Sequence, residues 1–166
     1  TTQHPNILSD GLLKAECDIP IKNALISDTA IKLPEILFIT TFPPRECGIA
    51  TYSQDLIKSL NDKFKNSFDI KICALESDNE QHHYTDSIKY ILNTDHPNSF
   101  ETLSEKINAN SSIQMVMLQH EFGLFRNNEA SLIEFLKKTI KPIIIAFHTV
   151  LPNANDSLKL NVQVIA

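Results

Sequence analysis

Ile36-Leu-Phe-Ile-Thr-Thr-Phe-Pro-Pro-Arg-Glu-Cys-Gly48 is the stretch of sequence from which the fold can be read. Its four leading apolar residues, 36–39, predict a strand buried on both faces, as in a parallel sheet. Pro43 and Pro44 cannot continue a strand, and Gly48 offers backbone freedom before the next element. A helix follows, with an apolar stripe formed by Ile49, Tyr52, Leu56, Ile57, Leu60 and Phe64.

This order of strand, tight loop and helix is the opening unit of a doubly wound α/β domain. Further apolar patterns predict strands over residues 68–75, 88–92, 113–118 and 143–147. Helices are expected from a cap at Asn98 or Ser99 through Ile107 and over residues 129–140, with a loop at 119–128. Because helical crossovers favour right-handed parallel connections, we expect a Rossmann-like parallel sheet of order 3-2-1-4-5, with helices on both faces.

The chain is expected to hold one such domain, over residues 35–166, behind an N-terminal extension of residues 1–34. Three prolines, Pro5, Pro20 and Pro34, interrupt any long element in that extension, so we expect it to be partly ordered at best. At the other end, an apolar helical pattern over residues 157–166 has no closing cap. We therefore expect the domain to be truncated there.

Composition excludes several classes of function. The net charge of -5 and the absence of clustered basic residues argue against nucleic-acid binding. No apolar run approaches the roughly 20 residues of a membrane span. Cys17, Cys47 and Cys73 form no CxxC motif, which suits a reducing compartment. We expect a cytoplasmic protein, with peripheral contact to a membrane left open.

The residues suited to chemistry follow the first, fourth and fifth predicted strands. The only two arginines of the chain, Arg45 and Arg126, lie in the first two of these loops, and His120 and His148 lie where the later strands end. Glu121 accompanies them. Arginine recognises phosphate or carboxylate groups through a planar fork, and histidine shares protons near neutral pH. The set predicts a pocket for a phosphorylated or sugar-like ligand.

Backbone amides at Gly48 and Ile49 open the first helix and would add partial positive charge for an anion. Purely structural roles compete with this interpretation, because loop arginines are often only solvated and histidines at strand ends are often hydrogen-bonded framework residues. No dinucleotide fingerprint, phosphate-binding P-loop or nucleophile elbow is present. No metal site is expected, since the histidines lack partners at zinc spacing.

Three motifs resemble those of GT-B glycosyltransferases of family 4, the group 1 type. They are the stretch from Ile36 through Tyr52, Leu118-Gln-His-Glu-Phe-Gly-Leu-Phe125 and Ala146-Phe-His-Thr-Val-Leu-Pro152, in the expected order. The resemblance covers roughly residues 35–166. It implies a retaining transfer of a sugar from a nucleotide-sugar donor to a carbohydrate or lipid-linked acceptor, with the nucleotide sugar as co-substrate and no metal cofactor.

The resemblance also implies roles for single residues. His120 matches the histidine of the family's His-Glu motif, which touches the transferred sugar, and is the expected catalytic residue. Gly48 and Ile49 match the loop near the donor phosphates, where the charge of Arg45 fits. His148, with Glu121 and Arg126, is expected on the acceptor and sugar side. A C-terminal GT-B domain, absent from this chain, would carry the nucleotide pocket, so this chain alone is expected to be inactive.

Two other hypotheses stay open at this point. The chain could be a stand-alone sugar- or phosphate-binding or interaction domain that has the fold without catalysis. It could also self-associate as a fragment, because an uncovered docking face exposes apolar surface. The sequence does not identify the sugar, the nucleotide or the acceptor.

Overall fold

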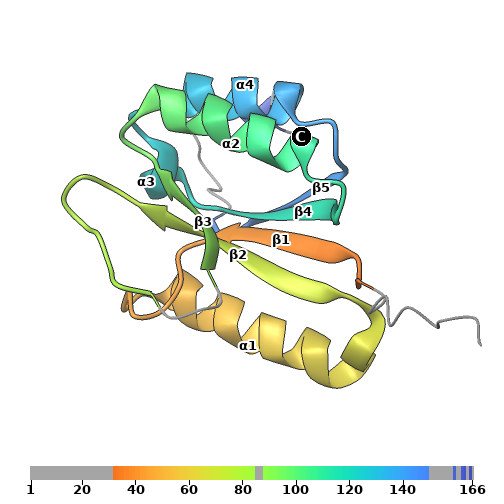
Figure 1. The fold of residues 1–166 in the computed structure, drawn as a ribbon. Coiled ribbons are helices and arrows are strands. Elements are labelled where there is room, and N and C mark those ends of the chain that lie inside the picture. Colours follow the sequence, from red (N-terminus) through yellow and green to blue (C-terminus); the bar gives the residue numbers. More distant parts are fainter. Residues whose placement is uncertain (1–31, 85–87, 150–158, 160–161, 164, 166) are drawn as a thin grey trace, which may run out of the picture. The chain divides into compact units, whose positions relative to one another are not determined.

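The computed structural model describes residues 32–84, 88–149, 159, 162–163 and 165. Its central feature is a sheet of five parallel strands in the order β3-β2-β1-β4-β5, which confirms the predicted topology (Figure 1). The chain visits the two halves of the sheet in turn, as a doubly wound fold requires. The strands are β1 (Glu35–Thr40), β2 (Asp69–Glu76), β3 (Ile88–Asn93), β4 (Ile113–His120) and β5 (Ile143–Phe147).

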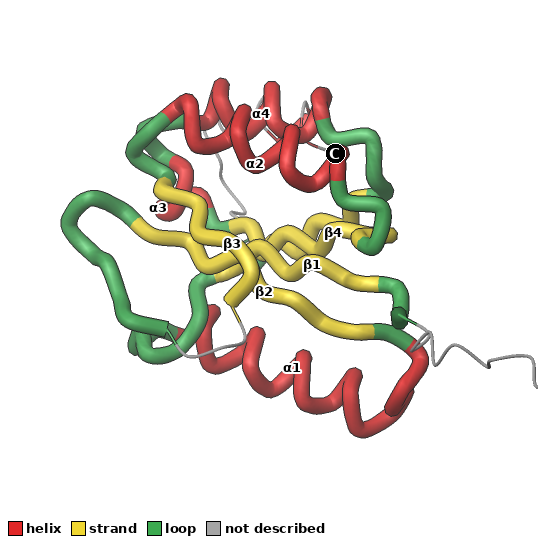
Figure 2. Tube along the Cα trace, viewed as in Figure 1, coloured by secondary structure: helices red, strands yellow, loops and turns green. Residues whose placement is uncertain are grey.

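The helices cover both faces of this sheet, also as predicted. Figure 1 and Figure 2 show α1 on one face, with α2 and α4 side by side on the other. Right-handed crossovers between parallel strands place successive helices in this way. The helices are α1 (Gly48–Phe64), α2 (Pro97–Ala109), α3 (Phe122–Phe125) and α4 (Glu129–Lys138), with a 3-10 turn, η1 (Lys65–Ser67), after α1.

The strand β1 is buried on both faces. Leu37, Phe38 and Ile39 are each 0% exposed, because alternate side chains point to the two helical layers. Leu37 and Ile39 belong to the larger hydrophobic core, which is built by the sheet together with α2, α3 and α4. The other core members are Cys73, Leu75, Leu92, Phe100, Leu103, Ile107, Ile113, Val116, Leu118, Phe125, Leu132 and Phe135.

The face by which α1 meets the sheet differs from the predicted stripe. Ala50 and Ser53 are the buried residues of this helix, whereas Tyr52 and Phe64 are 48% and 44% exposed. Small side chains allow the helix backbone to approach the sheet closely, and the larger apolar residues then lie at the margins of the contact. The predicted helix is confirmed, and four members of its apolar stripe, Ile49, Leu56, Ile57 and Leu60, are partly buried, whereas Tyr52 and Phe64 are not.

Two local expectations also need correction. The N-cap of α2 is His96 rather than Asn98 or Ser99, and Pro97 occupies the first turn, where its missing N–H costs nothing. Residues 119–128 are not all loop, because β4 continues through His120 and α3 follows it. Strong apolar patterns predict that these helices and strands exist, but they do not predict the residues at which they end.

Some expectations lie outside the described residues, among them the extension up to residue 31 and the turn at 151–156. Of the predicted final helix, the structure describes residues 159, 162, 163 and 165, each of them helical. Within the described residues, no helix is long and apolar enough to cross a membrane.

Candidate functional site

The carboxyl ends of β1, β4 and β5 lie next to one another, because these strands are parallel neighbours. His120 ends β4 and pairs with Phe147, the last residue of β5. The backbone N–H of His148 donates to the carbonyl of His120 at 3.0 Å, which extends the pairing one residue beyond β5. The sheet therefore places His120 and His148 side by side, as the sequence predicted.

His120 lies in an aromatic environment. Its ring stacks on Phe125 at a centroid distance of 5.5 Å and contacts Phe122 and Phe147 at 5.1 and 5.0 Å. The residue is 2% exposed, and its Nδ1 is buried without a hydrogen-bond partner among the described residues. Burial lowers the pKa of His120 below its ordinary value; the carboxylate of Glu121 opposes this shift and His148 adds to it. At neutral pH the imidazole is therefore uncharged.

His148 is held by two side chains that the sequence analysis did not single out. Its Nε2 lies 2.7 Å from Oε1 of Gln119, and its ring meets Tyr52 edge-on at a centroid distance of 5.0 Å. With the side-chain amide of Gln119 in this orientation, Nε2 of His148 carries the proton, and Nδ1 has a lone pair that can accept a hydrogen bond. Gln119 is 0% exposed, and its Nε2 has no partner among the described residues.

Glu121 also belongs to this group. Its Oε2 accepts a hydrogen bond from the hydroxyl of Thr149, the residue after His148. The carboxylate thus joins the loop after β4 to the loop after β5. It is only partly buried, which leaves room for contact with a ligand. We call His120, Glu121 and His148, with Gln119, the histidine cluster.

The two arginines meet at a separate hollow of about 110 Å³. Nη2 of Arg45 forms an ion pair with Glu80 at 2.8 Å, whereas Nε of Arg45 is buried and has no partner in the part of the chain that the structure describes. Arg126 is exposed and has no ion pair within the described part of the chain. The arginine hollow is lined by residues of the loops after β1, β2 and β3 and by residues of α3 and the segment after it, namely Arg45, Ser77, Thr94, Asp95, Gly123, Leu124, Arg126 and Asn127.

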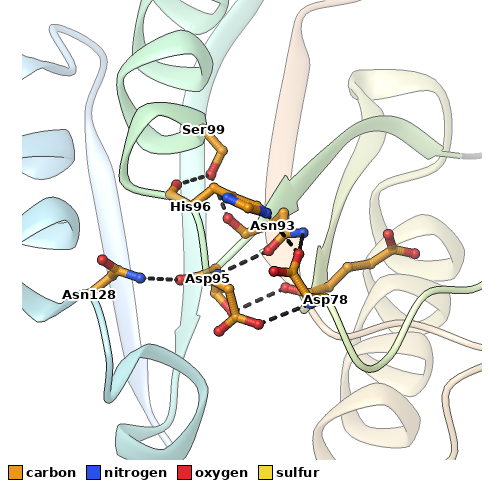
Figure 3. A network of polar contacts seen from close by, with 8 residues as sticks. Asp78, Asn93, Asp95, His96, Ser99 and Asn128 are labelled. Carbon is orange, nitrogen blue, oxygen red and sulfur yellow. Dashed lines mark hydrogen bonds and ion pairs between the residues drawn. The ribbon is translucent and has the colours of Figure 1, made fainter.

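Thr94 and Asp95, which line the arginine hollow, belong to the network of polar contacts drawn in Figure 3. Asp95 accepts a hydrogen bond from the backbone N–H of Asp78, and Asn93 donates to the Asp78 carboxylate at 2.8 Å. Nδ2 of Asn128 donates to the carbonyl of Thr94 at 2.8 Å, which ties the chain before α4 to the end of β3. The hydrogen bonds from Asn93 and His96 hold the pKa of Asp78 below its usual range, so its carboxylate stays ionised.

The start of α1 was expected to offer backbone amides to an anion. Its N-cap, Cys47, makes no side-chain capping bond, and the first turn holds no acidic residue. Gly48 is exposed, and a Cβ added there would meet no atom within 4 Å. The backbone freedom expected of Gly48 is not used, since it has no positive φ. Ile49 is half-buried beside it.

The predicted site residues therefore form two groups and a helix start. His120, Glu121 and His148 share contacts, Arg45 and Arg126 share a hollow, and Gly48 with Ile49 opens α1. Among the described residues no side-chain hydrogen bond or ion pair joins the histidine cluster to Arg45 or Arg126, although the backbone N–H of Leu124 at the arginine hollow donates to the carbonyl of Glu121 at 3.0 Å. Sequence reasoning missed Gln119, Tyr52, Glu80 and Thr149, whose contacts arise only when distant loops meet.

The described residues hold no group of three or more histidine, cysteine or carboxylate side chains that could bind a metal ion. Comparison of the chain with protein-family models, curated proteins and solved structures finds no match. The function must therefore be argued from the residues and from their geometry.

Proposed function

We propose that this domain is the acceptor-side half of a retaining glycosyltransferase that uses a nucleotide-sugar donor. In that reaction the bond between the anomeric carbon and the phosphate oxygen breaks. A bond from the anomeric carbon to an acceptor oxygen forms, and the acceptor loses a proton. A second domain would carry the nucleotide pocket, as in the glycosyltransferases that the sequence resembles, and this chain alone would not turn over.

The observation that carries the proposal is the buried, uncharged imidazole of His120 at the end of a central strand. Its Nδ1 lacks a partner among the described residues, and leaving a buried polar atom unpaired costs free energy. A sugar hydroxyl would supply that partner. Because the ring is neutral at pH 7, it can donate or accept such a hydrogen bond without bringing a charge into the site.

The neighbouring groups suit a polyhydroxylated substrate. Glu121 offers carboxylate oxygens, and His148 offers a lone pair on Nδ1 in the tautomer that Gln119 favours. The backbone amides at Gly48 and Ile49 would face the donor phosphates. Arg45 would add positive charge there, and Arg126 would contact the acceptor from the same hollow.

A binding domain without catalysis is the second candidate, and the arginine hollow favours it. The hollow lies within this chain and needs no second domain to form. If this candidate is correct, the 166-residue chain binds inorganic phosphate or a sugar phosphate by itself. The natural full-length protein would then release no nucleoside diphosphate from any nucleotide sugar.

The deciding experiment measures nucleoside diphosphate release by the natural full-length protein, with a panel of nucleotide sugars and acceptors. His120→Phe preserves the aromatic packing and removes the imidazole. We expect it to lower kcat by about a hundredfold or more, as the loss of one transition-state hydrogen bond does in other enzymes. Lys58→Gln, on the exposed side of α1, is the matched control and should leave turnover unchanged. Wild-type turnover in His120→Phe would remove His120 from the site.

A further inference from the structure

A second hollow, of about 650 Å³, lies elsewhere, along the edge strand β3. Its volume is within the range of small-molecule sites. None of its described lining residues comes from the loops that follow β1, β4 or β5. The lining comes from the chain before β3, from β3 and from α2, and comprises His82, His83, Tyr84, Ile88, Lys89, Tyr90, Ile91 and Lys106. We call it the β3 hollow.

Nδ1 of His82, a lining residue of the β3 hollow, is buried without a hydrogen-bond partner among the described residues. The hydroxyl of Tyr84, another lining residue, is also buried, and it interacts with the carboxylate of Glu76. Burial, and then the nearby carboxylate of Glu76, raises the pKa of Tyr84 to about 12, so its hydroxyl keeps its proton at neutral pH. Unpaired buried polar atoms cost free energy, which a ligand with matching polar atoms would recover.

Among the described lining residues of the β3 hollow, the uncompensated charge is positive. None of its described lining residues is acidic. The ammonium groups of Lys89 and Lys106 each lie 5.9 Å from the centre of the Tyr90 ring. Lys89 is neutralised by an ion pair with the buried Glu35, whereas Lys106 forms no ion pair within the described ranges. Outside the lining, Glu76 accepts the backbone N–H of His82 at 2.9 Å.

Aromatic surface and an unneutralised lysine occur together here. The ring of Tyr90 on β3 has the ammonium groups of Lys89, also on β3, and of Lys106, on α2, near it, and the neighbouring Ile91 is 52% exposed. A compact ammonium group binds phosphate as a point charge, and flat rings pack on tyrosine. We propose that the β3 hollow binds a planar organic phosphate of nucleotide size, with its phosphate on Lys106 and its ring against Tyr90. This site is independent of the glycosyltransferase proposal.

The test titrates the 166-residue chain with adenosine 5′-monophosphate and follows backbone amide shifts by NMR. We expect shifts centred on residues 82–84, 88–91 and 106. Lys106→Gln should weaken binding about tenfold, the usual effect of losing one charge-assisted contact. Lys106→Arg should keep most of the affinity, and Lys58→Gln should keep all of it. Lys106 and Lys58 are both exposed, so neither change threatens folding.

Adenosine and inorganic phosphate separate the two parts of the proposed ligand. Each should bind at least about tenfold more weakly than the monophosphate, because each makes only part of the contacts. Adenosine that binds as tightly as the monophosphate would overturn the role of Lys106. Absence of shifts at millimolar monophosphate, shifts centred on the arginine hollow, or equal affinity in Lys106→Gln would overturn the site. Activity of the full-length protein does not enter this test.

Discussion

His120 is a single side chain whose protonation should be visible in the stability of the domain. Its pKa is lowered in the folded state, mainly by burial, so the unfolded chain binds more protons as the pH falls below about 6.5. This stabilising contribution is therefore complete above that pH and is lost progressively on acidification. The slope from one such group reaches at most about 1.4 kcal/mol per pH unit.

We predict that wild type loses more stability than His120→Phe between pH 7.5 and 5.5. Urea unfolding at several pH values measures the difference, and proton NMR of the imidazole gives its titration directly. Comparison of the two proteins removes the contributions of the other histidines. Parallel stability curves, or an imidazole that titrates at or above the ordinary histidine value, would contradict the buried neutral state.

The chemistry of single residues was only partly visible in the sequence. His120 and His148 could be placed at strand ends, because apolar runs stop directly before them. Gln119 and Tyr52 could not be linked to His148, since their contacts cross from β4 and α1 to the loop after β5. The Arg45–Glu80 ion pair likewise joins two loops separated by β2. Local sequence patterns do not indicate which distant loops come into contact.

Among the helices, α1 is attached to the sheet by a buried hydrogen bond. The hydroxyls of Thr40 and Ser53 lie 2.6 Å apart, and both residues are 0% exposed. Thr40 also donates to the carbonyl of Thr41 at 2.9 Å. Because a hydroxyl has one proton, Ser53 is the donor and Thr40 the acceptor in their shared bond.

Ser53→Ala should therefore destabilise the domain by about 1 kcal/mol, the usual net worth of a neutral hydrogen bond. Chemical denaturation gives the change in the free energy of unfolding. The matched control is Ser59→Ala on the exposed side of α1, where the hydroxyl bonds only to the carbonyl of Asp55, and its effect should be near zero. When Ser53→Ala is added to Thr40→Val, it should cost little further stability, because the acceptor of the Ser53 hydroxyl is already gone. Equal effects of the two serine changes would refute the attachment.

The helices and strands themselves were predicted well where hydrophobic spacing is strong. The run at residues 36–39 and the spacing of Phe100, Leu103 and Ile107 each identified an element and its buried side. The two buried residues of α1, Ala50 and Ser53, were not among the predicted stripe, because small residues give no hydrophobic signal at the closest point of contact. The short α3 was missed because four residues cannot display a helical period.

For the domain as a whole, stability rests on the larger core between the sheet and the layer of α2 and α4. Phe135 of α4 is 1% exposed within this core. Removal of a buried phenylalanine loses its transfer free energy and leaves a cavity that the surroundings fill only in part. We predict that Phe135→Ala lowers the free energy of unfolding by about 3–5 kcal/mol.

Guanidinium unfolding of the 166-residue chain measures this loss. Phe64→Ala is the matched control, because Phe64 is 44% exposed and lies against Phe68 at the margin of the domain. Its effect should stay below about 1 kcal/mol, since surface positions contribute little. Similar losses in the two variants would mean that the core is not where the structure places it.

The pairing of β1 with both β2 and β4 determines the order in which the sheet can form. β1 pairs with β2 through Glu35 and Asp69, but its other partner, β4, begins at Ile113. No tight hairpin joins any of the five strands, so each pairing must close a long loop, and folds dominated by such pairings form slowly. During synthesis β1 emerges before the other four strands of this sheet, and one of its edges stays unpaired until β4 is made. An unpaired strand edge is open to strand exchange with other chains during that interval.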